Sequence, residues 1–170
     1  MKPMLRLLLT LLSLLLSLNE ATAQNAPAVP GGAREFKDML KGFPSKEFLK
    51  LRGNTKVETS MEMSKQITAK ELGKEGTYRG KVTKIEVWPF PERGITGWRL
   101  AVEDDLKQGS MTINVWAWVY VHTDPNGVIP KIKVGKEVTV TGKVNRADLS
   151  VTEAPRLNID LIVTAMTAQK

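Results

Sequence analysis

The feature that most constrains the fold is an alternation of apolar and polar residues, which begins at Gly76 and continues almost to the end of the chain. A period of two residues, with many β-branched side chains and frequent turn residues, is typical of strands rather than helices. We therefore predict a mainly β domain over residues 76–166. Its five strands are expected at residues 77–88, 98–104, 111–122, 137–145 and 156–165.

The first predicted strand changes its alternation half-way along. Residues up to Val82 keep one parity, whereas Ile85 and Val87 follow the other. A β-bulge between them, near residues 83–84, would turn both sets towards the interior and bend the strand. Gly80 in this strand and Gly142 in the fourth indicate close backbone approach or sharp coiling. A long bent strand with interior glycines is what a small, highly coiled barrel needs.

The first 23 residues predict a cleavable secretory signal peptide. Lys2 and Arg6 form a basic start, residues 7–18 form a leucine-rich apolar stretch, and residues 21–23 (ATA) form a small-x-small cleavage site. The apolar stretch is shorter than the roughly 18 residues that identify a membrane-spanning helix. We therefore expect an exported bacterial protein, periplasmic or secreted, with no transmembrane segment in the mature chain.

Between the signal peptide and the strands, two further parts are predicted. Residues 24–33 are rich in Pro, Gly and Ala, which favours a flexible leader. Residues 34–75 predict a helical N-terminal extension, because apolar residues recur at helical spacing from Phe36 to Leu49, with a break at Pro44. Residues 55–66 are ambiguous, and residues 67–73 predict one helical turn.

Cysteine content and net charge limit the functions that the chain can have. The chain has no cysteine, which excludes disulfides, thiol catalysis and thiolate metal sites. Its formal net charge is +7, and about +6 remains if the predicted signal peptide is removed. A positive charge favours anionic partners such as nucleic acid or acidic glycans. The same charge also suits simple solubility, because the basic residues are spread along the chain.

The strands together resemble an OB-fold domain, of the tRNA-binding-like or bacterial exported kind. The resemblance rests on four segments: GTYRGKVTKIEVW (76–88), GWRLAVEDD (97–105), MTINVWAWVYV (111–121) and IKVGKEVTVTGKV (132–144). It implies a five-stranded Greek-key barrel. Many OB-folds carry a helix between the third and fourth strands, but residues 123–136 contain two prolines and two glycines and predict a loop. The alternative is another small barrel, or an open sheet packed on the N-terminal helix.

The third predicted strand carries a row of aromatic residues. Trp116, Trp118 and Tyr120 share one parity, while the odd-numbered positions are aliphatic and are expected to face the core. The OB-fold resemblance implies that ligands cross this outer face, where rings could stack on bases or sugars. The alternative is that the N-terminal helix packs on the rings, since its own apolar residues need a partner. The sequence favours this helix packing over a ligand platform.

Basic residues are predicted to line the same outer face. They are Arg79, Lys81, Arg93, Arg99, Lys143 and Arg146. The resemblance places Arg93 and Arg146 in loops that flank the ligand, where guanidinium groups could hold phosphates or sulfates. The alternative is an ordinary solvated surface, because acidic residues are interleaved with the basic ones.

No catalytic residue, metal site or cofactor is predicted. His122 is the only histidine, and Asp104 and Asp105 lack the spacing of a cation-binding loop. The predicted function is therefore an exported, non-catalytic OB-fold module that binds nucleic acid or an anionic glycan. One alternative is an interaction or structural domain that docks an envelope protein. A remote alternative is a metal-assisted hydrolase that uses Asp104, Asp105 and His122.

Overall fold

The computed structural model describes residues 32–124 and 127–168. The predicted signal peptide and nearly all of the predicted leader lie outside these residues. The strands are β1 (Arg34–Glu35), β2 (Glu75–Phe90), β3 (Ile95–Gln108), β4 (Met111–Val121), β5 (Glu137–Ser150) and β6 (Arg156–Ala168). The helices are α2 (Ser45–Lys50) and α3 (Lys56–Glu71), with short 3₁₀ turns η1 (Phe36–Leu40), η2 (Pro91–Arg93) and η4 (Ile129–Lys131). No helix in this described part is long and apolar enough to cross a bilayer.

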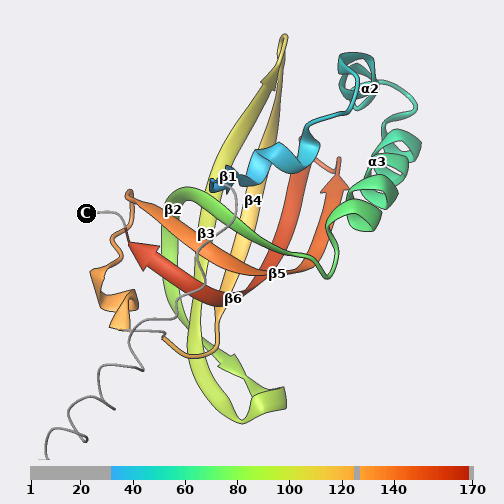
Figure 1. Cartoon of the computed structure of the whole chain (residues 1–170). Helices are drawn as coiled ribbons and strands as arrows, with labels where there is room; N and C mark the ends of the chain where they lie inside the picture. The colour runs from blue at the N-terminus through green and yellow to red at the C-terminus, as the bar shows by residue number, and fades with distance from the viewer. Residues whose placement is uncertain (1–31, 125–126, 169–170) are drawn as a thin grey trace, which may run out of the picture. The chain divides into compact units, whose positions relative to one another are not determined.

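Strands β2 to β6 form a closed barrel (Figure 1). The sheet order is β1-β2-β3-β4-β6-β5, and a second pairing between β2 and β5 closes the ring. Strands β4 and β6 run parallel, whereas the other barrel pairs are antiparallel. Five strands closed in this order are the Greek-key barrel of the OB-fold. The predicted fold class is therefore confirmed.

Strand β2 bends so that it can pair with two neighbours. Its first half pairs with β5 and its second half with β3, and the register shifts between Val82 and Lys84, where the bulge is predicted. Val82 is buried and Ile85 is half-buried, but Val87 is 66% exposed. The prediction that both sets turn into the core is therefore wrong at Val87. The reason is that the β2–β3 hairpin extends beyond the barrel (Figure 1).

Four of the strands, β2, β3, β5 and β6, are longer than predicted. Strands β3 and β4 pair as far as Gln108 and Met111, so a two-residue turn at 109–110 replaces the predicted six-residue turn. Strand β5 continues past a bulge between Val144 and Arg146 to Ser150, five residues beyond the predicted end at residue 145. This extension forms because Ala147 is buried on the side where α3 packs.

The two interior glycines, Gly80 and Gly142, each lie where a larger side chain would clash, but with different neighbours. A Cβ atom at Gly142 would lie 2.4 Å from the carbonyl oxygen of Ile162, and one at Gly80 would lie 2.4 Å from a methyl group of Val102. The first contact is with backbone, which cannot rotate away. Gly142 therefore allows β5 to approach β6 where their register shifts.

Replacing Gly142 with alanine is expected to lower the free energy of unfolding by about 1–3 kcal/mol, because the added methyl group overpacks the barrel wall. Urea unfolding measures the change. Gly53→Ala is the matched control, since its new Cβ would lie 3.7 Å from the nearest atom, an ordinary contact. Equal stability of the two variants would contradict the close approach.

The N-terminal extension contains one long helix, α3, most of which lies in residues 55–66, where the sequence pattern is ambiguous. Helix α3 includes the predicted single turn at 67–73 only as its end. Its buried face includes Met63 and Ile67, while the apolar Met61 is 57% exposed, so the helical pattern in the sequence is weak. The hydroxyl of Thr68 donates a hydrogen bond to the carbonyl of Ala147, 2.8 Å away, which ties α3 to β5.

Strand β1 is fixed by a partly buried polar cluster of Arg34, Glu71 and Tyr78. Arg34 on β1 donates two hydrogen bonds to the Glu71 carboxylate, at 3.3 and 2.6 Å, and another to the Tyr78 hydroxyl. The Glu71 side chain is only 2% exposed. Burial raises the pKa of Tyr78 above its ordinary value. This cluster joins the extension to the first barrel strand.

The extension packs against inward-facing residues of the barrel. Phe36 stacks on Tyr78, with ring centroids 4.8 Å apart, and lies beside Gly80. Met39 and Leu40 are also buried in the same core. The favoured prediction, that this extension covers Trp116, Trp118 and Tyr120, is therefore wrong. Its apolar residues pack in the barrel core and not on the outer aromatic row.

Candidate ligand-binding face

Strand β4 places its aromatic residues on the outside of the barrel, as the alternation predicts. Trp116, Trp118 and Tyr120 are half-buried, whereas the odd-numbered residues from 111 to 121 are at most 1% exposed. The rings are partly covered by one another and by side chains from β2, β3 and β6.

Arg99 on β3 lies between two indole rings. Its guanidinium carbon is 3.5 Å from the centroid of Trp88 and 3.8 Å from that of Trp118. Glu86 stands directly opposite Arg99 in the β2–β3 register and accepts a hydrogen bond from its Nε at 2.7 Å. Hydrogen bonds from Lys84 and then Arg99 lower the pKa of Glu86, so its charge is maintained. Cation–π attraction and the ion pair together fix the guanidinium between the rings.

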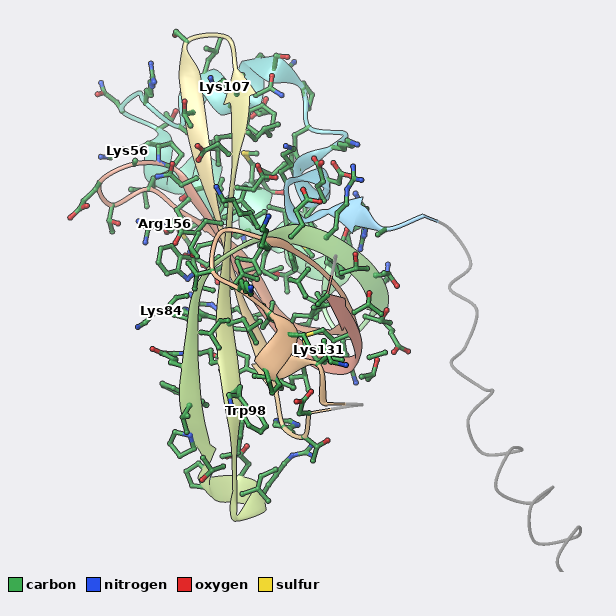
Figure 2. The ribbon with its side chains drawn as sticks, turned by 90° about the vertical axis from the view of Figure 1, so that its left-hand side faces the viewer. Lys56, Lys84, Trp98, Lys107, Lys131 and Arg156 are labelled. Atoms are coloured by element: carbon green, nitrogen blue, oxygen red, sulfur yellow. The ribbon has the colours of Figure 1, made fainter. Side chains whose placement is uncertain are left out.

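The row of rings continues in both directions from this pair. Trp116 meets Trp118 edge-on at 5.5 Å, and the guanidinium of Arg156 lies 5.5 Å above Trp116. Tyr120 meets Trp88 edge-on at 6.4 Å, on the side of the β2–β3 hairpin. We call this set the aromatic ladder: Trp88, Phe90, Trp116, Trp118 and Tyr120, with Arg99 and Arg156. Figure 2 shows Arg156 between Lys107, at the tip of the β3–β4 hairpin, and Trp98 in the β2–β3 hairpin.

His122 lies beside Phe90, at one end of the aromatic ladder. Its ring meets Phe90 edge-on at 4.3 Å. Burial, and then the charge of Arg93, lower the pKa of His122. Asp124 does not pair with it and instead accepts backbone hydrogen bonds, including one from Val128 at 2.7 Å.

The residues of the remote hydrolase alternative, Asp104, Asp105 and His122, do not come together. Asp105 pairs with Asn114, near one end of β4, whereas His122 follows the other end. Eight residues of extended strand separate those positions, which is about 26 Å at 3.3 Å per residue. Among residues 32–124 and 127–168, no three acidic or histidine side chains gather to hold a metal ion.

The predicted basic residues divide into two groups. Arg99 belongs to the ladder, and Arg146 forms an ion pair with Asp148 and faces Asp160, the neighbour of Trp118. Lys143 lies two strands from Tyr120 in the register, across Ile162. The others have no contact with the rings that the structure records: Arg79 pairs with Glu35, Lys81 stands between Glu103 and Glu137, and Arg93 lies in η2 at the hairpin tip, near His122.

Three residues of the face were not predicted. Trp88 and Phe90 share the outward parity that follows the bulge in β2, so the alternation contained this signal. Arg156 is the first residue of β6 and pairs with Asn114 across the parallel β4–β6 register. Nothing local in the sequence places Arg156 beside Trp116.

The barrel and its outer face define an OB-fold domain whose first and third barrel strands, β2 and β4, carry outward aromatic rings, with Arg99 of β3 between them. No family model matches the chain, and no curated protein matches it. One similar solved structure is a small single-stranded DNA-binding protein from Streptomyces coelicolor, with 18% identity, a TM-score of 0.37, and coverage of 57% of this chain and 94% of that one.

Two replication protein A domains are also similar. The second OB-fold domain from Methanococcus maripaludis has 15% identity and a TM-score of 0.27, covering 59% of this chain and 88% of that one. DNA binding domain A from S. cerevisiae has 18% identity and a TM-score of 0.26, covering 55% and 79%. Likeness at these scores does not identify a ligand for this chain.

Proposed function

We propose that this chain is an exported, non-catalytic OB-fold module that binds a single-stranded nucleic acid across the aromatic ladder. The observation that carries the proposal is the ladder itself, in which Trp118 and Trp116 continue a stack that begins at Trp88 and Arg99. Unpaired bases stack on such rings with little regard to sequence. The leucine-rich N-terminal segment supports export.

The two arginines of the aromatic ladder differ in whether their charge is already paired. Arg99 is only 15% exposed and is paired with Glu86, so it mainly fixes the rings. Arg156, by contrast, is exposed and forms no ion pair with any described residue. A guanidinium beside a ring, with no ion-pair partner, can hydrogen-bond a nucleotide while its base stacks. The face therefore offers more to a base-bearing polymer than to a purely anionic one.

The proposal is tested by titrating the mature protein with a short oligothymidine and with a duplex of the same length, while following tryptophan fluorescence. The single strand is expected to bind at least about tenfold more tightly, because a duplex keeps its bases stacked inside and offers the rings only its backbone. Binding of the single strand should weaken as salt rises.

Two outcomes would contradict the proposal. Equal binding of single strand and duplex would mean that charge alone attracts nucleic acid. Absence of oligothymidine binding, together with binding of a sulfated glycan such as heparin, would assign the face to an anionic glycan. The glycan titration is run under the same salt conditions.

A further inference from the structure

A cleft of about 370 Å³ opens at the Trp116 end of the aromatic ladder. Outward-facing residues of three strands line it: Glu103 and Asp105 from β3, Asn114 and Trp116 from β4, and Arg156 from β6. Asp105, Asn114 and Arg156 stand side by side in the register, and Glu103 stands opposite Trp116. Its volume lies within the range of small-molecule sites.

Several polar groups around this cleft have no partner among the described residues. The Asp105 carboxylate accepts no hydrogen bond and forms no ion pair, and the Arg156 guanidinium is equally free. Trp116 Nε1 is the one buried side-chain nitrogen or oxygen in the described part of the chain without a hydrogen-bond partner. Asp104 differs, because Lys37 neutralises it at 3.1 Å. The cleft thus places an acceptor and a cationic donor, neither with a hydrogen-bond or ion-pair partner, beside the Trp116 ring.

We propose that this cleft binds a guanine base. The inference rests on the proposed function, since the base would belong to a strand that lies on the ladder. Guanine carries two adjacent donors, N1–H and the 2-amino group, on one edge and two adjacent acceptors, O6 and N7, on another. A carboxylate matches the first edge and an arginine matches the second. Asp105 and Arg156 supply these groups, and Trp116 supplies the stacking surface.

The other bases match these groups less well. Adenine and cytosine each offer one amino group beside an acceptor, and thymine has one N–H between two carbonyls. None of them offers a pair of donors to a carboxylate, so each would leave Asp105 facing a lone pair. A phosphate alone is also disfavoured here, because Glu103 and Asp105 would repel it. The carboxylates therefore select a base edge instead of the backbone.

The test uses single nucleotides, which do not need the rest of the ladder. The ¹⁵N-labelled mature protein is titrated with dGMP, dAMP, dCMP and dTMP, and the indole N–H signal of Trp116 is followed by NMR, assigned with Trp116→Phe. We expect the Trp116 signal to move with dGMP at roughly 5- to 150-fold lower concentration than with the others, as one bidentate base contact gives about 1–3 kcal/mol of discrimination. Asp105→Asn should remove most of that preference.

Glu137→Gln is the matched control, because Glu137 is also an exposed strand carboxylate but lies on β5, opposite Lys81. It should leave the dGMP preference unchanged. Equal shifts with all four nucleotides, or no shift with any, would overturn the guanine assignment even if oligothymidine binds. Selective dGMP binding without oligothymidine binding would support the cleft and contradict the proposed function. The two failures are therefore distinguishable.

Discussion

Replacing Arg34 with alanine is expected to lower the free energy of unfolding by about 3–5 kcal/mol, because it leaves a buried carboxylate without its counter-charge. Glu71 is 2% exposed, and its remaining cation would be Lys70, with Nζ 3.8 Å away. The Tyr78 hydroxyl would lose its donor in the same step. Urea unfolding at neutral pH, followed by circular dichroism, measures the loss.

Two further variants separate this effect from a general weakening of β1. Arg79→Ala removes a neighbouring but exposed ion pair with Glu35, 3.3 Å long, and should change stability by no more than about 1 kcal/mol. Replacing Arg34 and Glu71 together by methionine and leucine should restore most of the stability, because no uncompensated charge remains. A loss for Arg34→Ala no larger than that for Arg79→Ala would show that the cluster is not structurally important.

The barrel could be predicted from the sequence because its determinants are local. Alternation identifies each strand, and the parity change before Ile85 identifies the bulge. Helix α3 was hard to recognise, since Val57 and Met61 are apolar but exposed and so blur its pattern. The two-residue strand β1 has no local signal, because Arg34 is positioned by Glu71, 37 residues later.

The candidate site was predictable only in part, because some of its contacts join residues that are distant in the sequence. Parity along β4 places Trp116 and Trp118 on one face. The position of Arg99 between rings depends on pairing across three strands, and the cleft depends on Arg156 arriving on β6. The direction in which the extension packs was wrongly predicted, because apolar spacing shows that a segment needs a partner but not which surface supplies it.

Replacing Trp116 and Trp118 together by alanine is expected to weaken oligothymidine binding by about 30-fold or more at constant salt. Each base stacked on an aromatic ring contributes roughly 1–3 kcal/mol, so losing two rings costs about 2–6 kcal/mol of binding free energy. The dependence of affinity on salt should stay the same, because its slope reports the number of phosphates neutralised and both substitutions leave the cations in place. Fluorescence-labelled oligothymidine measures both quantities without relying on the tryptophans that are removed.

The matched variant replaces the same two tryptophans by phenylalanine, which keeps a stacking surface and should recover most of the affinity. Trp98→Phe changes a ring that packs against the core on the inner side of β3, and it should leave binding unchanged. Thermal melting shows whether the alanine variant remains folded. If it does not, oligothymidine binding is compared between the wild type and the double phenylalanine variant. Full affinity in the folded alanine variant would exclude base stacking, and a flatter salt dependence would mean that the rings act by positioning Arg99 and Arg156 on phosphates.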